Sequence, residues 1–137
     1  MSVPKHKRGK SKLEVVTKAI ELADYTVRIC SNEKNFPKRH RWSITSKIVD
    51  DALAIHDHVR KSNSIYVKIK SDFEIRRQYQ NRAIATIDSM LGKMDIAYKM
   101  FNIDDKRMEH WIGIIVEVRK LLRGWRKSDY KKYKDLI

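Results

Sequence analysis

The stretch that decides the fold is residues 108–125, which read MEHWIGIIVEVRKLLRGW. Large apolar side chains recur there at alternating spacings of three and four residues, at Met108, Trp111, Ile115, Val118, Leu122 and Trp125. This alternation follows the 3.6-residue period of an α-helix, so these side chains share one face. Asp104 or Asp105 can cap the N-terminus of the helix and complement its dipole. The sequence therefore predicts an amphipathic helix with one face in a core.

A first helix is predicted from about Ser11 to Cys30, and it carries two adjacent apolar stripes. One stripe comprises Leu13, Val16, Ile20, Ala23, Val27 and Cys30, and the other comprises Val15, Ala19, Leu22 and Ile29. Ser11 and Glu14 form a capping-box pattern at its start. Because an apolar stripe is normally covered by a neighbour, two stripes indicate a bundle that also associates.

Two further helices are predicted between these segments. The second begins near Ser43 and repeats at Ile44, Ile48, Ala52, Ile55 and Val59. The third runs from about Asp72 to Phe101 and repeats at Ile84, Ile87, Leu91, Met94, Tyr98 and Phe101. A glycine inside a helix costs about 1 kcal/mol relative to alanine, so Gly92 suggests close approach of another helix. The stretch 61–71 is open between an extension of the second helix and an ordered loop.

Four periodic segments with short connections predict an all-α fold, an up-down antiparallel four-helix bundle. The chain has only four glycines and two prolines, and both prolines lie outside the periodic stretches. We expect the bundle to span residues 13–127, between a basic N-terminal arm at 1–12 and a basic C-terminal tail at 128–137.

The charge balance points to a polyanionic partner. The chain carries 31 Lys and Arg against 17 Asp and Glu, a formal net charge of +14. Nucleic acid is the leading candidate, because each cation that meets a phosphate releases counterions. An acidic protein partner and a merely solubilising charge are the alternatives. Cys30 is the only cysteine, which fits a reducing cytosol. With no apolar run long enough to span a bilayer and no signal-peptide core, we expect a cytoplasmic protein.

Motifs for catalysis or metal binding are absent from the sequence. It has no Gly-rich phosphate loop, no His-Glu-x-x-His zinc motif and no Glu-x-x-His of the di-iron bundles. The nearest acidic and histidine cluster comprises Asp50, Asp51, His56, Asp57 and His58. His56 and His58 point to different sides of a helix and cannot chelate one ion together. We therefore predict a protein that is not an enzyme and has no cofactor or metal site.

The basic clusters are the candidate binding residues. The predicted nucleic-acid contacts are Lys38, Arg39 and Arg41 in the first loop, Arg76 and Arg77 in the third helix, and Arg119, Arg123, Arg126 and Lys127 in the fourth. The N-terminal arm adds Lys5, Lys7, Arg8, Lys10 and Lys12. Aromatic side chains beside these clusters could stack on unpaired bases: Trp42, Tyr79, Trp125 and Tyr130. For Trp111 and Trp125 the core register favours packing instead.

The order of three motifs resembles a known family. These motifs are the loop Phe36-Pro37-Lys38-Arg39-His40-Arg41-Trp42, the helix opening Glu109-His110-Trp111 and the turn-like Leu121-Leu122-Arg123-Gly124-Trp125. Over about residues 13–127 the chain resembles the accessory variability determinant (Avd) proteins of bacterial and phage diversity-generating retroelements. Their relatives include four-helix proteins encoded in ribosomal RNA intervening sequences.

The resemblance implies a homopentameric barrel of four-helix bundles whose positive surface binds nucleic acid and the retroelement's reverse transcriptase. The polymerase would carry out mutagenic retrohoming, while the accessory protein holds RNA, cDNA and enzyme together. Five copies of +14 would carry +70. Gly124 would then allow close helix approach beside Trp125. The alternative is a protein-interaction scaffold of the intervening-sequence type without a retroelement role.

Overall fold

The computed structural model describes the backbone of residues 3–137 and the side chains of residues 14–137. Four long helices make up most of this part of the chain: α1 (Val3–Cys30), α2 (Ser46–Ser64), α3 (Lys70–Met100) and α4 (Asp105–Lys132). Short turns are η1 (Lys38–His40) and the π-helical η2 (Arg41–Thr45) before α2, and η3 (Lys134–Leu136) after α4. No strand occurs among the described residues. The predicted all-α class is confirmed.

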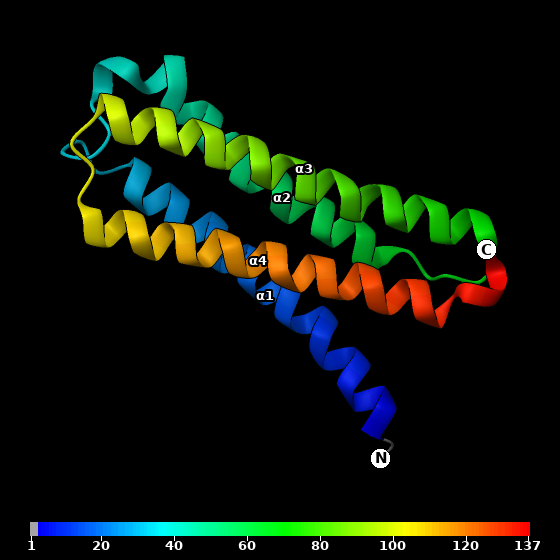
Figure 1. The fold of residues 1–137 in the computed structure, drawn as a ribbon. Coiled ribbons are helices and arrows are strands. Elements are labelled where there is room, and N and C mark those ends of the chain that lie inside the picture. The colour runs from blue at the N-terminus through cyan, green and yellow to red at the C-terminus, as the bar shows by residue number, and fades with distance from the viewer. Residues whose placement is uncertain (1–2) are drawn as a thin grey trace.

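The helices form an up-down bundle (Figure 1). Each helix contacts the next one along the chain, and α4 returns to contact α1. The connections after α2 and after α3 are short, so consecutive helices run antiparallel. The α1–α2 turn and the α3–α4 turn therefore lie at one end of the bundle, and the α2–α3 turn and the end of α4 lie at the other.

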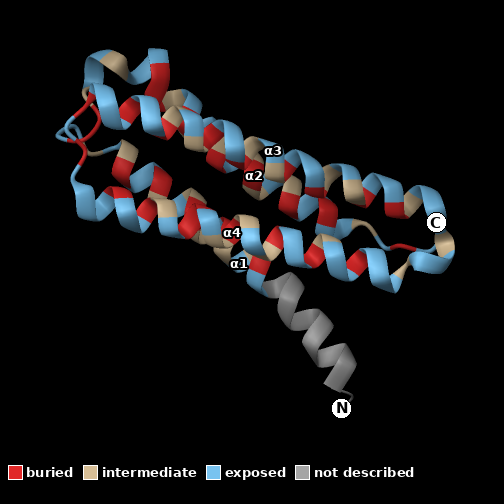
Figure 2. Cartoon of the chain, viewed as in Figure 1, coloured by how far each residue is buried: buried red, intermediate tan, exposed pale blue. Residues whose placement is uncertain are grey.

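The cores of α2 and α4 match their predicted faces. Every predicted core residue of the second helix, from Ile44 in η2 to Val59 in α2, and of α4, from Met108 to Trp125, is buried. Figure 2 shows these buried positions on the inward sides of the helices. Trp111 is fully buried, and its indole Nε1 donates a hydrogen bond to Thr26 Oγ1 of α1 at 2.9 Å. The predicted cap of α4 is also present, because the Asp104 carboxylate accepts the backbone N–H of Arg107.

In α1 the second apolar stripe forms the core. Of the first stripe, the side chain of Leu13 lies outside the described residues, and Val16 and Cys30 only line the core. Val15, Ala19, Leu22 and Ile29 are buried, while Ile20 is 48% and Val27 43% exposed. The spacing alone could not decide between two stripes of similar quality. The positions of α2 and α4 decide, because both contact α1 from the side of the second stripe.

In α3 the predicted register is partly wrong. Ile87, Met94 and the following Phe101 are buried as predicted, but Tyr98 is 43% exposed and Ile84 and Leu91 only line the core. The buried face also includes polar residues near the start of the helix, so apolar periodicity did not reveal it; it comprises Phe73, Arg76, Gln80, Ala83, Ile87, Met90, Met94 and Ala97.

Two glycines do not mark close approach within the chain. A Cβ atom added at Gly92 or at Gly124 would meet nothing within 4 Å, and both positions are exposed. The predictions that Gly92 and Gly124 allow a neighbouring helix to approach are therefore wrong for contacts within one chain.

Both alternatives for residues 61–71 apply in part, because α2 extends through Ser64 and an ordered loop follows it. The loop comprises residues 65–69, with Ile65 and Ile69 in extended backbone conformations, and α3 begins at Lys70. The Asp72 carboxylate accepts the backbone N–H groups of Lys68 and Ile69 at 3.1 and 3.2 Å, which fixes the chain as it enters α3. None of the described helices is both long and apolar enough to cross a membrane.

The ends of the predicted bundle differ from the sequence estimate. α1 begins at Val3, upstream of the start predicted near Ser11. The side chains of the predicted basic arm lie outside the described residues. α4 continues beyond Lys127 to Lys132, so the first part of the predicted tail is helical.

Candidate nucleic-acid interface

The outer side of the C-terminal half of α4 carries the densest positive charge of the described chain. Residues 119–134 include eight Lys and Arg but one acidic residue, Asp129, and Asp129 is buried. We use the name α4 basic surface for Arg119, Lys120, Arg123, Arg126, Lys127, Lys131 and Lys132 together with Arg77 of α3. All of these side chains are exposed or half-buried. Since the only carboxylate of this segment points inward, the outer surface has no acidic residue of its own.

Two arginines from different helices meet on the α4 basic surface. Arg77 of α3 donates from Nη2 to the backbone oxygen of Arg126 at 3.0 Å. Arg126 in turn donates from Nη1 to Asn81 Oδ1 at 2.9 Å. Burial, followed by the positive charge of Arg126, lowers the pKa of Arg77. Because two like charges are held close together, a bound phosphate would relieve their repulsion and accept hydrogen bonds from both.

Arg76 is not available to a nucleic acid, which corrects the sequence-based assignment. It is 1% exposed, and its Nε lies 3.0 Å from Asp129 Oδ2. Its guanidinium lies 5.0 Å from the centre of the Trp125 ring, and Gln80 donates to the same Asp129 oxygen at 2.9 Å. Arg76 faces the core because it lies one helical turn before Gln80, on the buried face of α3. We call this buried group, Arg76, Gln80, Trp125 and Asp129, the Arg76 network.

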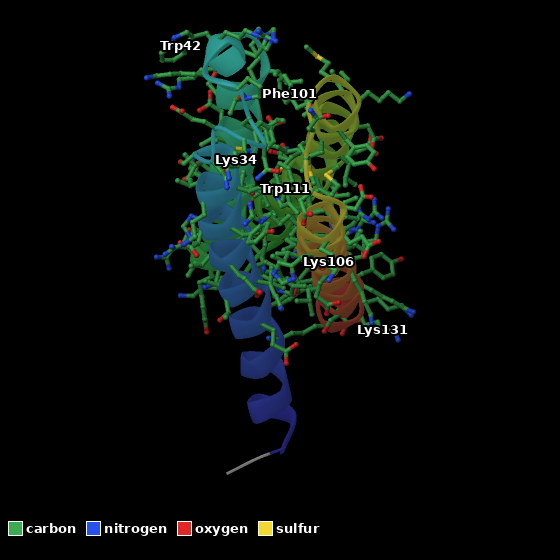
Figure 3. All side chains as sticks on the ribbon, turned by 90° about the vertical axis from the view of Figure 1, so that its left-hand side faces the viewer. Lys34, Trp42, Phe101, Lys106, Trp111 and Lys131 are labelled. Carbon is green, nitrogen blue, oxygen red and sulfur yellow. The ribbon has the colours of Figure 1, made fainter. Side chains whose placement is uncertain are left out.

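The remaining predicted cations are accessible. Arg123 and Lys127 are exposed, and Arg119 and Arg126 are half-buried on α4. Lys38, Arg39 and Arg41 are exposed at the α1–α2 turn, at the opposite end of the bundle. Figure 3 shows this separation through Trp42 and Lys131, which lie at opposite ends. The structure therefore separates the predicted contacts into two surfaces rather than one.

The aromatic candidates differ in exposure. Trp111 and Trp125 are buried, as the core register predicted. Tyr79 is half-buried beside the His58 ring at 6.3 Å, with Arg82 and Lys61 5.3 and 5.8 Å from its centre. In contrast, Trp42 is 79% and Tyr130 52% exposed. Only these last two candidates offer a free ring to a base.

The acidic and histidine cluster of α2 does not converge. Asp51 forms an ion pair with Lys93 of α3 at 2.8 Å, while His58 lies against Tyr79. Burial lowers the pKa of His58. No group of three or more His, Cys, Asp or Glu that could hold a metal ion occurs within the described part of the chain.

Three features of the structure are not indicated by the apolar periodicity or by the basic clusters. Asp129 is buried although it lies in the predicted basic tail, and its position as a single acidic residue among eight Lys and Arg is the one signal in the sequence. Lys34 and Lys47 are exposed on either side of the predicted loop cluster and were not selected. Cys30 is half-buried, and burial raises its pKa to about 12, so its thiol stays protonated at neutral pH.

Comparison of the chain with protein-family models, curated proteins and solved structures found no match.

Proposed function

We propose that this chain is a non-catalytic, oligomeric nucleic-acid-binding protein that acts beside a reverse transcriptase and its template RNA and cDNA. The observation that carries the proposal is the α4 basic surface. Asp129, the only acidic residue of residues 119–134, forms an ion pair with the buried Arg76. The outer Lys and Arg side chains of this segment therefore have no acidic partner within it. The link to a reverse transcriptase comes from the resemblance to the Avd proteins.

Binding at the α4 basic surface would be electrostatic and weakly dependent on sequence. Lys and Arg side chains on the outside of a helix meet phosphates, and phosphate contacts position a protein without reading bases. The described chain has no recognisable base-reading module. We therefore expect affinity to fall steeply with salt, since each neutralised phosphate releases counterions.

A charge-reversal variant tests the α4 basic surface. The triple variant Arg119→Glu, Arg123→Glu and Arg126→Glu should bind single-stranded RNA much more weakly. For single strands the slope of log affinity against log salt should fall by about 2, given about 0.7 per phosphate contact. Binding would be followed by fluorescence anisotropy over a salt series.

The matched control places the same charge change elsewhere. Arg60, Lys99 and Lys106 are exposed, none of them is ion-paired to a described carboxylate, and all lie outside the α4 basic surface. The variant Arg60→Glu, Lys99→Glu and Lys106→Glu lowers the net charge as much as the first triple variant does. It therefore measures the loss of affinity that comes only from weaker long-range attraction between protein and RNA. Equal losses in both triple variants would overturn the site assignment, and no RNA binding by the wild type would overturn the function.

The proposed oligomer is a homopentamer. The exposed apolar stripe of α1 supports self-association, because Ile20 is 48% exposed there and Leu53 on the neighbouring α2 is 47% exposed. We expect Ile20→Glu to dissociate the oligomer in mass measurements by light scattering, while Lys18→Glu leaves it intact. The complete proposal is tested by copurifying the tagged protein with RNA and with a reverse transcriptase encoded beside its gene.

The second candidate is a four-helix protein-interaction scaffold of the intervening-sequence type. The same exposed apolar residues favour it, since such patches often mark protein interfaces. A purified oligomer that retains neither RNA nor polymerase at moderate salt would support the scaffold.

A further inference from the structure

Trp42 is fixed in an exposed position by an unusual turn. It is 79% exposed, more than any other large hydrophobic residue of the described chain. It lies in the π-helical turn η2, where the Ser46 backbone N–H donates to the Arg41 oxygen. Ile44 and Thr45 of the same turn are buried. π-helical turns are rare in proteins, and those that occur often lie at functional sites. Because this turn is anchored in the core, the Trp42 indole is held in an exposed position where a ligand can contact it.

A groove opens beside the indole. It lies between the end of α1 and the start of α2 and has a volume of about 360 Å³. Val27, Cys30 and Val49 supply apolar walls, Ser46 and Asp50 supply polar atoms, and Trp42 forms one side. An apolar groove with an aromatic side and a few polar atoms suits a flat heterocycle. The Asp50 carboxylate would repel a phosphate but can accept hydrogen bonds from a base.

Cations precede and follow Trp42 in the chain, and one of them, Arg41, lines the groove together with Asp50. Lys34, Lys38, Arg39, Arg41 and Lys47 are exposed, and residues 34–49 contain no Asp or Glu. Among the ion pairs of the described residues, none involves these five cations. Phosphates would therefore contact these cations, while the uncharged ring of a base packs against Trp42 in the groove.

We propose that Trp42 stacks on an unpaired nucleobase that enters this groove, while phosphates of the same strand contact Lys38, Arg39 and Arg41. The inference rests on the proposed function and deepens it, because it makes single-stranded nucleic acid the preferred ligand. Stacking on an exposed aromatic ring needs a base with a free face. A base inside a duplex is covered on both faces and cannot enter.

The fluorescence of the protein can report this contact directly. Trp111 is fully buried and Trp125 is 3% exposed, so a collisional quencher such as acrylamide reaches only Trp42. We expect a short oligouridylate to quench the tryptophan emission and to protect Trp42 from acrylamide. An RNA duplex of the same length should do neither, although it binds to the α4 basic surface.

The decisive variant is Trp42→Ala, with Trp42→Phe as the conservative replacement. We expect Trp42→Ala to raise the Kd for the single strand about 5- to 150-fold, which corresponds to about 1–3 kcal/mol per stacked base. Trp42→Phe should retain most of the affinity, and duplex binding should be unchanged in both. The matched control is Tyr66→Ala, since Tyr66 is 77% exposed with Lys68 5.4 Å from its ring centre, at the other end of the bundle.

The outcomes separate this inference from the function on which it rests. If no nucleic acid binds to the wild type, the proposed function fails and the inference fails with it. If the wild type binds but Trp42 is not quenched, or if Trp42→Ala and Tyr66→Ala behave alike, only the inference is overturned. A Trp42→Ala variant that loses self-association and keeps single-strand affinity would instead assign the groove to a protein contact.

Discussion

The two ends of the bundle each combine a tryptophan with arginine, and they use the pair in opposite ways. In the Arg76 network, Arg76 and Trp125 are 1% and 3% exposed, and the guanidinium lies 5.0 Å from the ring centre. At the α1–α2 turn, which we call the Trp42 end, Trp42 is 79% exposed and its neighbour Arg41 is exposed as well. The same residue types are therefore structural at one end and free for a ligand at the other.

A carboxylate and the helix register account for the difference. Asp129 lies on the inner face of α4 and neutralises Arg76 at 3.0 Å, which makes burial of the charge tolerable. At the Trp42 end, neither Arg39 nor Arg41 forms an ion pair with a described carboxylate. These arginines therefore stay in water, and the tryptophan beside them lies in a turn outside the core register.

The largest expected difference between the ends is in stability. Trp125→Ala should lower the free energy of unfolding by about 3–5 kcal/mol, because it leaves a cavity and removes the ring beside Arg76. Trp42→Ala should change it by less than about 0.5 kcal/mol, as at other exposed sites. Urea unfolding of both variants measures the contrast. Similar losses in the two would mean that Trp42 also supports the fold.

The ion pair of the Arg76 network gives the next effect. Asp129→Asn keeps the shape of the side chain but leaves Arg76 buried without a counter-charge, so we expect a loss of about 3 kcal/mol. The triple variant Arg76→Met, Gln80→Leu and Asp129→Leu should recover most of this loss, since an apolar group of similar volume needs neither a counter-charge nor a hydrogen-bond partner. Asp135→Asn, at an exposed carboxylate, is the control. A harmless Asp129→Asn would show that water reaches Arg76.

A smaller effect of opposite sign is expected at Gly124, next to Trp125. A Cβ there would meet nothing within 4 Å, so Gly124→Ala should raise the free energy of unfolding by about 0.5–1 kcal/mol through helix propensity. Thermal unfolding and light scattering would be measured together. Dissociation of an oligomer by the added methyl group would show that Gly124 faces another copy.

The smallest effect at neutral pH is expected from Cys30, beside the Trp42 groove. Burial raises its pKa from 9.0 to about 12, so the folded thiol holds its proton where the unfolded thiol loses it. Its contribution to stability is complete below pH 9 and is lost as the pH rises toward 12. Below pH 9 the thiolate fraction should be about a thousandfold lower in the folded state. Slow labelling by a disulfide reagent at pH 8, compared with the urea-unfolded chain, would confirm it, and equal rates would contradict it.

The sequence was sufficient to predict the buried face of a helix where that helix carries one apolar stripe. α2 and α4 each have a single continuous stripe, so the period predicted the buried face from Ile48 to Val59 in α2 and from Met108 to Trp125 in α4. Helix number and class followed from the same period and from the scarcity of glycine and proline. The sequence also predicted cations that a ligand can reach, and five of them are exposed: Lys38, Arg39, Arg41, Arg123 and Lys127.

Only the tertiary structure decided between alternatives that the sequence pattern supports equally well. α1 carries two stripes, and contact with α2 and α4 selected the one at Val15, Ala19, Leu22 and Ile29. Arg76 reads as a surface cation until α4 brings Asp129 to within 3.0 Å of it, 53 positions further along the chain. The spacing of residues along a helix shows which side chains share a face of that helix. Which face is covered, and which charge is neutralised, depends on residues distant in sequence that only packing brings together.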